Sequence, residues 1–246
     1  MSKPAPWRGH DAEIDAILGA RHGDPFAFLG PHDVEGGVVV RALVPGAECL
    51  SAVTSRGEVL LERRRDEGFF EGLAPEGLRD GRYRLKAANA SGEWTFEDPF
   101  AFGPVLGEVD DYLLVEGSHR RLYDKLGAHL TERDGVAGVA FAVWAPRAQR
   151  VSIVGDFNGW DGRRNPLRRR VDSGLWEGFA PGLGEGAVYK YEILGARGDL
   201  QPLKADPFGF EAELRPSTAS VVARTDRFTW SDADWMARRA AVEDSR

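Results

Sequence analysis

The chain has 246 residues, of which 42% are hydrophobic and 29% charged, a composition typical of a globular protein and not of a disordered one. Its net charge of −7 and pI of about 5.4 argue against a nucleic-acid-binding surface. The single cysteine, Cys49, excludes an intrachain disulfide, and the sequence has neither a signal-peptide core nor 18 consecutive apolar residues. We therefore expect a cytoplasmic protein that binds neither nucleic acid nor membrane.

The sequence contains an internal repeat with a period slightly above 100 residues. The matching segments keep their order along the chain, and they pair residues 44–47 with 145–148, 70–75 with 176–181, and 98–102 with 206–210. The offset grows along the chain, so the second copy carries extra residues between its first and its later strands. A period this long is unlike that of a solenoid and predicts two tandem domains.

Each copy has the pattern of short β-strands. Val139, Phe141 and Val143 alternate with small residues, and Tyr189 and Tyr191 alternate with polar ones. The 30 Gly and 14 Pro residues favour many turns between such runs. We therefore predict an all-β protein made of two tandem immunoglobulin-like β-sandwich modules.

Cap residues and apolar spacing also predict short helices at the N-terminus, in the linker and at the C-terminus, over residues 11–19, 118–127 and 231–243. The predicted organisation comprises five parts. They are an N-terminal helical segment (1–20), a first sandwich (21–110), a helical linker (111–130), a second sandwich (131–228) and a C-terminal segment (229–246).

Six segments carry a resemblance to a known family. They are HGDPFAFLGPH at 22–32, LYDKLGAH at 122–129, VWAP at 143–146, GDFNGWDGRR at 155–164, VYKYE at 188–192 and RPSTASVV at 215–222. In this order they resemble the N-terminal region of bacterial glycogen branching enzymes. The resemblance covers nearly the whole chain. It implies that the second module is similar to the starch- and glycogen-binding sandwich of those enzymes.

In that family a (β/α)₈ barrel follows this region and carries the catalytic carboxylates. Such a barrel takes about 250 residues, whereas 16 residues follow Trp230, so we expect no catalytic residue in this chain. The resemblance implies a non-catalytic, glucan-binding and chain-length-modulating part of a 1,4-α-glucan branching enzyme of glycogen biosynthesis. Its partners would be an α-glucan, such as glycogen or a maltooligosaccharide, and the catalytic barrel of the parent enzyme. No cofactor is implied.

Three residues are candidates for carbohydrate binding. Trp160 lies in a turn-rich loop, and in related modules the matching ring stacks on glucose; the alternative is packing on the barrel or on Trp176. Lys190 is predicted to face away from Tyr189 and Tyr191, where its match donates to sugar hydroxyls, unless it is an ordinary surface lysine. Asn158 either bonds a hydroxyl or caps the turn.

Two departures weaken the match to glycogen-sensing modules. Residues 198–203 lack the second stacking tryptophan, and Ser220 stands where those modules carry an asparagine. The first copy lacks the Phe-Asn-Gly-Trp loop, which predicts a structural or chain-length-modulating role. Trp94 is its one candidate ring for a sugar, and the alternative for Trp94 is a core or edge position of the sandwich. His22 and His32 lack a third ligand at metal-binding spacing, so we predict no metal site.

Two other functions stay open from the sequence. A stand-alone glycogen-binding adaptor would use the same loop but would need high affinity from this chain alone. The front end of a debranching or trehalose-forming glucan enzyme would generally carry one such sandwich, whereas this chain has two.

Overall fold

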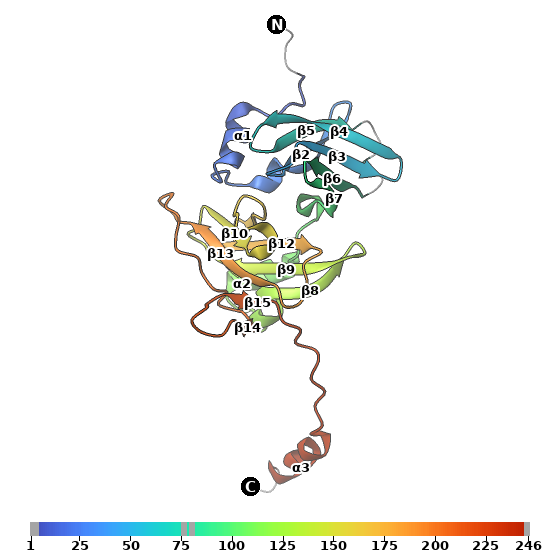
Figure 1. Cartoon of the computed structure of the whole chain (residues 1–246). Helices are drawn as coiled ribbons and strands as arrows, with labels where there is room; N and C mark the ends of the chain where they lie inside the picture. The colour runs from blue at the N-terminus through green and yellow to red at the C-terminus, as the bar shows by residue number, and fades with distance from the viewer. Residues whose placement is uncertain (1–4, 75–77, 79–81, 244–246) are drawn as a thin grey trace.

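The computed structural model describes residues 5–74, 78 and 82–243. Two bodies of β-sheet lie one above the other, and the C-terminal helix lies apart from both (Figure 1). Pro75, the last residue of the first repeated segment, lies outside the described residues. No helix in the described ranges combines the length and the apolar character that a membrane crossing requires.

The first module contains seven strands. They are β1 (Gly30–Val34), β2 (Gly37–Leu43), β3 (Cys49–Thr54), β4 (Gly57–Arg65), β5 (Phe69–Ala74), β6 (Arg84–Asn89) and β7 (Gly92–Glu97). All pairings are antiparallel, in the order β1-β2-β5-β4-β3-β6-β7. Val40 and Phe70 from one half of this sheet and Leu50 and Leu85 from the other bury their side chains in one core. The module is thus a sandwich whose two layers belong to one continuous sheet.

The layers are continuous because β4 is long enough to belong to both. Residues 57–61 of β4 pair with β3, and residues 62–65 pair with β5 across a register shift between Arg63 and Arg65. A shift of this kind bends a strand and increases its twist. The sheet therefore folds over its own apolar face.

The second module has eight strands in two sheets. They are β8 (Gly127–Arg133), β9 (Val136–Trp144), β10 (Arg150–Val154), β11 (Arg168–Arg170), β12 (Leu175–Pro181), β13 (Val188–Leu194), β14 (Glu211–Ala212) and β15 (Ser220–Val221). The sheet orders are β11-β12-β9-β8 and β10-β13-β15-β14. Phe141 and Trp176 of the first sheet pack in one core with Ile153, Tyr189 and Tyr191 of the second. This confirms the predicted β-sandwich and the inward direction of the two tyrosines.

The extra residues of the second copy lie where the first copy has β4. A loop over residues 155–167 interrupts this position, and only the short β11 continues it. An isolated bridge between Ser152 and Pro166 joins the loop back to β10. The interruption separates the two layers that β4 joins in the first module.

Two of the three predicted helices are confirmed. They are α1 (Asp11–Leu18) and α3 (Ala233–Glu243). Ile14 and Ile17 of α1 are buried against Phe28 and Phe69 of the first module. The apolar stripe of α1 therefore anchors it on the sandwich.

The prediction of a linker helix over residues 118–127 is wrong. The helix of the linker is α2 (Glu108–Glu116), and residues 118–127 contain only one 3-10 turn, η3 (Leu122–Asp124). Gly117 adopts a left-handed conformation with φ of 76°, and the N–H groups of Ser118 and His119 bond back to the Leu113 carbonyl. These bonds end the helix just where the prediction starts it.

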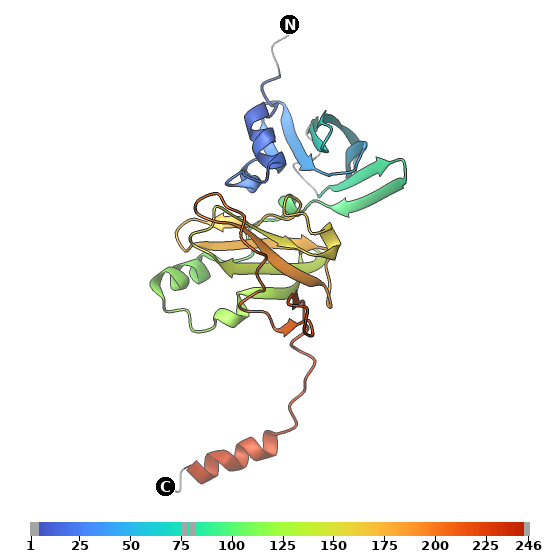
Figure 2. The same ribbon diagram turned by 60° about the vertical axis from the view of Figure 1, so that its left-hand side comes forward.

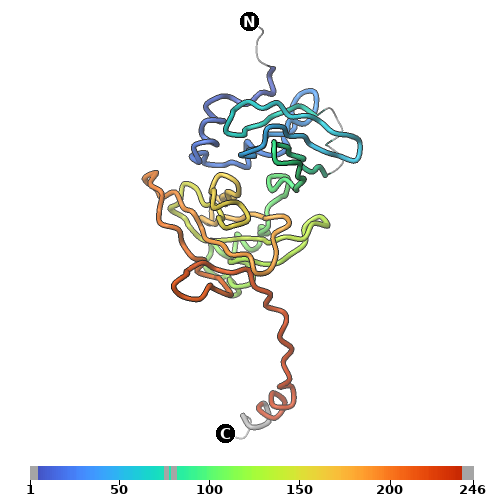
Figure 3. The backbone as a smooth tube through the Cα atoms, viewed as in Figure 1, coloured from blue at the N-terminus to red at the C-terminus, as the bar shows by residue number. Residues whose placement is uncertain are grey.

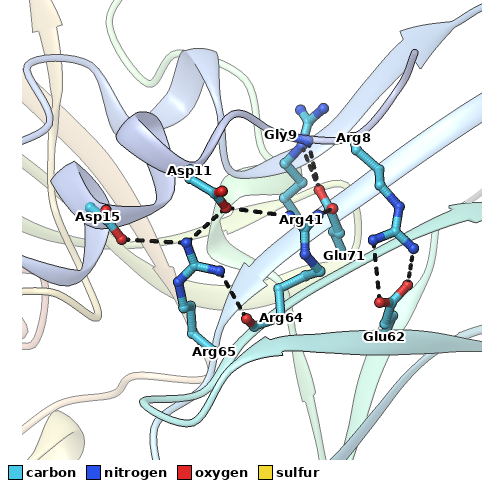
Figure 4. A network of polar contacts seen from close by, with 9 residues as sticks. All are labelled: Arg8, Gly9, Asp11, Asp15, Arg41, Glu62, Arg64, Arg65 and Glu71. Atoms are coloured by element: carbon cyan, nitrogen blue, oxygen red, sulfur yellow. Dashed lines mark hydrogen bonds and ion pairs between the residues drawn. The ribbon is translucent and has the colours of Figure 1, made fainter. Parts of the chain in front are cut away.

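A buried glutamate in each copy holds the start of the helical segment that precedes it. The Gly9 N–H donates to Glu71 Oε2 at 2.9 Å, and the Val105 and Leu106 N–H groups donate to Glu177 Oε2 at 2.9 and 2.6 Å. Both glutamates are fully buried and lie 106 residues apart. In Figure 4 arginines surround the first of them, which forms ion pairs with Arg41 and Arg64.

Aromatic side chains and one arginine join the two modules. The guanidinium of Arg168 lies 4.3 Å from the ring centre of Phe26, in η1 (Pro25–Ala27), and donates to the Phe102 carbonyl at 3.1 Å. Phe102 and Phe179 pack edge to face with ring centres 4.8 Å apart. The modules are stacked, and η2 (Pro99–Ala101) lies between them (Figures 2 and 3).

Candidate functional site

The loop after β10 has a tightly determined backbone. It opens with a 3-10 turn, η4 (Asp156–Asn158), and then places Gly159 and Trp160 in the left-handed region with φ of 66° and 60°. A left-handed conformation is unusual for a bulky aromatic residue. The Trp160 N–H donates to the Gly155 carbonyl at 2.9 Å, which closes the turn. Such local strain persists only where the surroundings fix it, and it gathers at functional sites.

Asn158 holds this loop together from inside. It is 3% exposed, and its Oδ1 accepts the Gly155 N–H at 3.1 Å. Its Nδ2 donates to the Ile153 carbonyl and to Asn165 Oδ1, each at 2.9 Å. The hydrogen bonds of its side-chain amide are therefore made within the protein, as the turn-capping interpretation requires. Its hydrogen bond to a sugar hydroxyl stays a prediction.

Trp160 presents its ring from within this loop. The side chain is 38% exposed, and its Nε1–H donates to Asp156 Oδ1 at 2.8 Å. This bond satisfies the one polar group of the indole and fixes the orientation of the ring. A half-exposed ring of fixed orientation has the form that stacking on the apolar face of a sugar requires.

Lys190 lies beside the same loop. In the register of β13 it pairs with Val154, the residue that ends β10 directly before the loop begins. Its neighbours Tyr189 and Tyr191 are buried and donate their hydroxyls to Asp206 Oδ2 at 2.7 and 2.9 Å. Lys190 is half-buried, and its Nζ donates to Thr218 Oγ1 at 2.7 Å. The strand thus directs the ammonium group away from the core.

The two departures seen in the sequence have structural counterparts. Residues 198–203 present Leu200 and Leu203, both exposed, where a second ring was sought. Ser220 is buried, and its Oγ accepts the Asp206 N–H at 2.9 Å. Among the described residues, no three His, Cys, Asp or Glu side chains gather as a metal site would require.

A cleft between the modules is the feature that sequence reasoning missed. It encloses about 360 Å³ and is lined by Trp94 of the first module and by Phe157, Asn158 and Arg164 of the second. Phe157 and Asn158 belong to the same loop as Trp160. The Phe-Asn-Gly-Trp pattern pointed to the loop, but no local pattern reports which residues of the other module face it.

Comparisons with known proteins place each module in a described family. Residues 10–100 match the N-terminal domain of the alpha-1,4-glucan branching enzyme GlgB. Residues 125–209 match carbohydrate-binding module 48, also described as the isoamylase N-terminal domain. The two matches, in this order, are those of the N-terminal region of glycogen branching enzymes. The residues that match carbohydrate-binding module 48 include Trp160, Lys190 and Asn158.

Individual relatives agree with this family. The chain is 52% identical over 234 residues to the 1,4-alpha-glucan branching enzyme GlgB of Paramagnetospirillum magneticum, covering 95% of this chain and 31% of that protein. It is 54% identical over 223 residues to the enzyme of the same name from Mesorhizobium japonicum, covering 90% of this chain and 30% of that protein. The chain thus spans about a third of the length of these relatives. Such relatives favour neither the adaptor nor the debranching alternative.

A likeness to solved structures also exists. The crystal structure of pullulanase type I from Bacillus subtilis complexed with maltose matches 79% of this chain and 26% of that chain, with 17% identity and a TM-score of 0.37. This degree of superposition bears on neither the site nor the function.

Proposed function

We propose that this chain is the glucan-binding, chain-length-modulating N-terminal part of a 1,4-α-glucan branching enzyme. The observation that carries the proposal is the half-exposed ring of Trp160, whose orientation is fixed by a hydrogen bond to Asp156. This ring lies in a module that matches a carbohydrate-binding family. Such a ring stacks on the apolar face of a glucose unit, and a few placed donors then select its hydroxyls. The ligand in this proposal is a chain of glycogen or a maltooligosaccharide.

Lys190 and Asn158 have different roles in the proposal. Lys190 is the donor to sugar hydroxyls, because its ammonium group lies outside the core and the hydrogen bond to Thr218 uses one of its three N–H groups. Asn158 keeps the loop in the conformation that presents Trp160, because its side-chain amide donates a hydrogen bond to the Ile153 carbonyl of β10. Loss of Asn158 would therefore weaken binding through the shape of the loop.

The proposed action on a glucan polymer is tethering. A weak site that holds one chain of an already engaged polymer raises the local concentration of its other chains without any new contact. The C-terminal segment has a different proposed partner, which is the catalytic barrel of a longer parent protein. Residues 228–236 expose four large apolar side chains, those of Phe228, Trp230, Trp235 and Met236, which suit packing against another domain.

We also propose that each repeat unit includes the helical segment before its sandwich. The predicted bounds placed these segments, residues 1–20 and 111–130, outside the sandwiches of 21–110 and 131–228. Gly9 lies just before α1 and Leu106 just before α2, and their bonds to Glu71 and Glu177 tie each helix to the interior of the sandwich that follows. These bonds support the larger units, and the second unit then begins before residue 111.

Affinity electrophoresis in a gel that contains glycogen tests the proposed function. The intact chain should be retarded, and Trp160→Ala should weaken the retardation at least about tenfold, which corresponds to about 1.4 kcal/mol of stacking. Trp144→Ala is the matched control, because Trp144 is another exposed indole of this module whose Nε1–H is bonded, in this case to the Ser173 carbonyl.

Equal retardation of the two variants would contradict the role of Trp160. Absence of retardation of the intact chain at millimolar glucan-chain concentrations would contradict glucan binding altogether. Circular dichroism of each variant establishes that the sandwich is folded before the gels are compared.

A further inference from the structure

The cleft between the modules has walls of carbohydrate-binding character. Its volume of about 360 Å³ falls within the range of roughly 300–1,000 Å³ that is usual for small-molecule sites. Trp94 and Phe96, on β7, contribute rings from the first module, and Phe157 contributes a ring from the second. Trp94 and Phe96 pack partly on the core of the first module, so these rings are held in place. Phe157 is 36% exposed.

The cleft also contains hydrogen-bond donors that the protein leaves free. The guanidinium of Arg164 and the Nε1–H of Trp94 have no hydrogen-bond or ion-pair partner in the described part of the chain. Asn165 also lines the cleft; its Oδ1 accepts from Asn158, and its Nδ2 has no hydrogen-bond partner among the described residues. Rings combined with a few placed donors form the pattern that recognises a sugar.

The charge of the cleft favours a neutral ligand over an anion. Glu97 lines the same cleft as Arg164, and so does the buried Asp98. Glu97 is already paired with Arg84 at 3.0 Å, while Asp98 accepts hydrogen bonds from Tyr83 and from the Phe100 N–H. The charges of Arg84 and Arg164 balance those of the two carboxylates, so the cleft offers no net attraction to an anion, whereas a polyhydroxylated neutral chain needs none.

The loop that carries Trp160 also forms one wall of this cleft. Phe157 lines the cleft, and Trp160 follows it by three residues in the same short loop (Figure 1, in yellow). We propose that the cleft is a second α-glucan contact, in which Trp94 of the first module acts together with Phe157 and Arg164 of the second. This inference rests on the proposed function, and it gives the first module a direct part in binding.

Nuclear magnetic resonance of the full isotope-labelled chain tests the proposal with maltoheptaose as the probe. The indole N–H signals of Trp94 and Trp160 are assigned from Trp94→Phe and Trp160→Phe variants. Both signals should shift as maltoheptaose is added. Arg164→Ala should raise the concentration for half-maximal shift of the Trp94 signal at least fivefold and change that of Trp160 by less than twofold. Arg197→Ala replaces an exposed arginine of the second module and should change the half-maximal concentration of neither indole signal.

The outcomes separate this inference from the proposed function. A shift of the Trp160 signal without a shift of the Trp94 signal at saturation would contradict glucan binding in the cleft and would leave the proposed function intact. A Trp94 shift that Arg164→Ala does not weaken would also overturn the cleft, because it would show an effect transmitted from Trp160. The proposal is also contradicted if inorganic phosphate or an apolar peptide shifts the Trp94 signal and maltoheptaose does not. If neither indole responds to maltoheptaose, both proposals fall.

Discussion

At the scale of single residues, each copy buries an aspartate before a Pro-Phe pair and bonds it to tyrosine. Asp98 accepts from the Tyr83 hydroxyl, and Asp206 accepts from the hydroxyls of Tyr189 and Tyr191. Burial raises the pKa of Asp98 to about 6, although the bonds from Tyr83 and from the Phe100 N–H act in the opposite direction. The protonated form is therefore favoured by folding relative to the unfolded chain.

This pKa predicts a definite dependence of stability on pH. A carboxyl with a raised pKa contributes stability that is fully present below about pH 3.8 and is lost as the pH rises through 6. The loss from Asp98 between pH 4 and pH 7 is roughly 2–3 kcal/mol. Urea unfolding should show a smaller fall over this range for Asp98→Asn than for the wild type. The surface variant Asp172→Asn is the control, and parallel curves for wild type and Asp98→Asn would contradict the prediction.

At the scale of elements, the two copies share a helix, a 3-10 turn and a strand that starts with a left-handed glycine. Gly30 begins β1 with φ of 90°, and Gly127 begins β8 with φ of 101°. A Cβ on Gly30 would lie 2.7 Å from Phe100 Cβ, and one on Gly127 would lie 2.8 Å from the Phe208 carbonyl oxygen. The Asp-Pro-Phe segment of each copy therefore packs against the backbone that opens its first strand.

A pair of glycine substitutions separates backbone strain from this close packing. Gly127→Ala should lower the free energy of unfolding by about 3 kcal/mol or more, because it combines an unfavourable φ with a clash against main-chain atoms. Gly186→Ala is the matched control, since Gly186 has φ of 83° but no atom within 4 Å of an added Cβ. It should lose only about 1–2 kcal/mol. Equal losses in urea unfolding would show that the packing against Phe208 has no energetic weight.

At the scale of the whole molecule, the relative placement of the modules decides whether the cleft exists. Burial lowers the pKa of Arg168, whose guanidinium nevertheless stays charged over the ring of Phe26. Arg168 is half-buried, and a partly desolvated cation over an aromatic face contributes about 1–2 kcal/mol. The contact therefore helps hold the two sandwiches in the orientation that brings Trp94 near Phe157.

Removal of this contact should loosen the modules without unfolding either. Arg168→Ala should increase the radius of gyration in small-angle X-ray scattering and weaken the response of Trp94 to maltoheptaose. Arg169→Ala is the control, because Arg169 is the exposed neighbour on β11 and its guanidinium lies 6.0 Å from the Trp176 ring centre, within its own module. An unchanged radius for Arg168→Ala would show that other contacts fix the orientation.

The sequence alone determined the two modules, because strand alternation and a repeat of about 100 residues are local or directly comparable along the chain. It also identified the loop of Trp160, since Asn followed by Gly favours a turn whatever the tertiary context. It misplaced the linker helix, because the left-handed Gly117 ends α2 and no apolar stripe marks that helix. The buried roles of Asn158 and Glu177, the continuous sheet of the first module and the cleft beside Trp94 depended on tertiary structure. Each arises from contacts between residues distant in sequence or from hydrogen bonds that close only in the folded state.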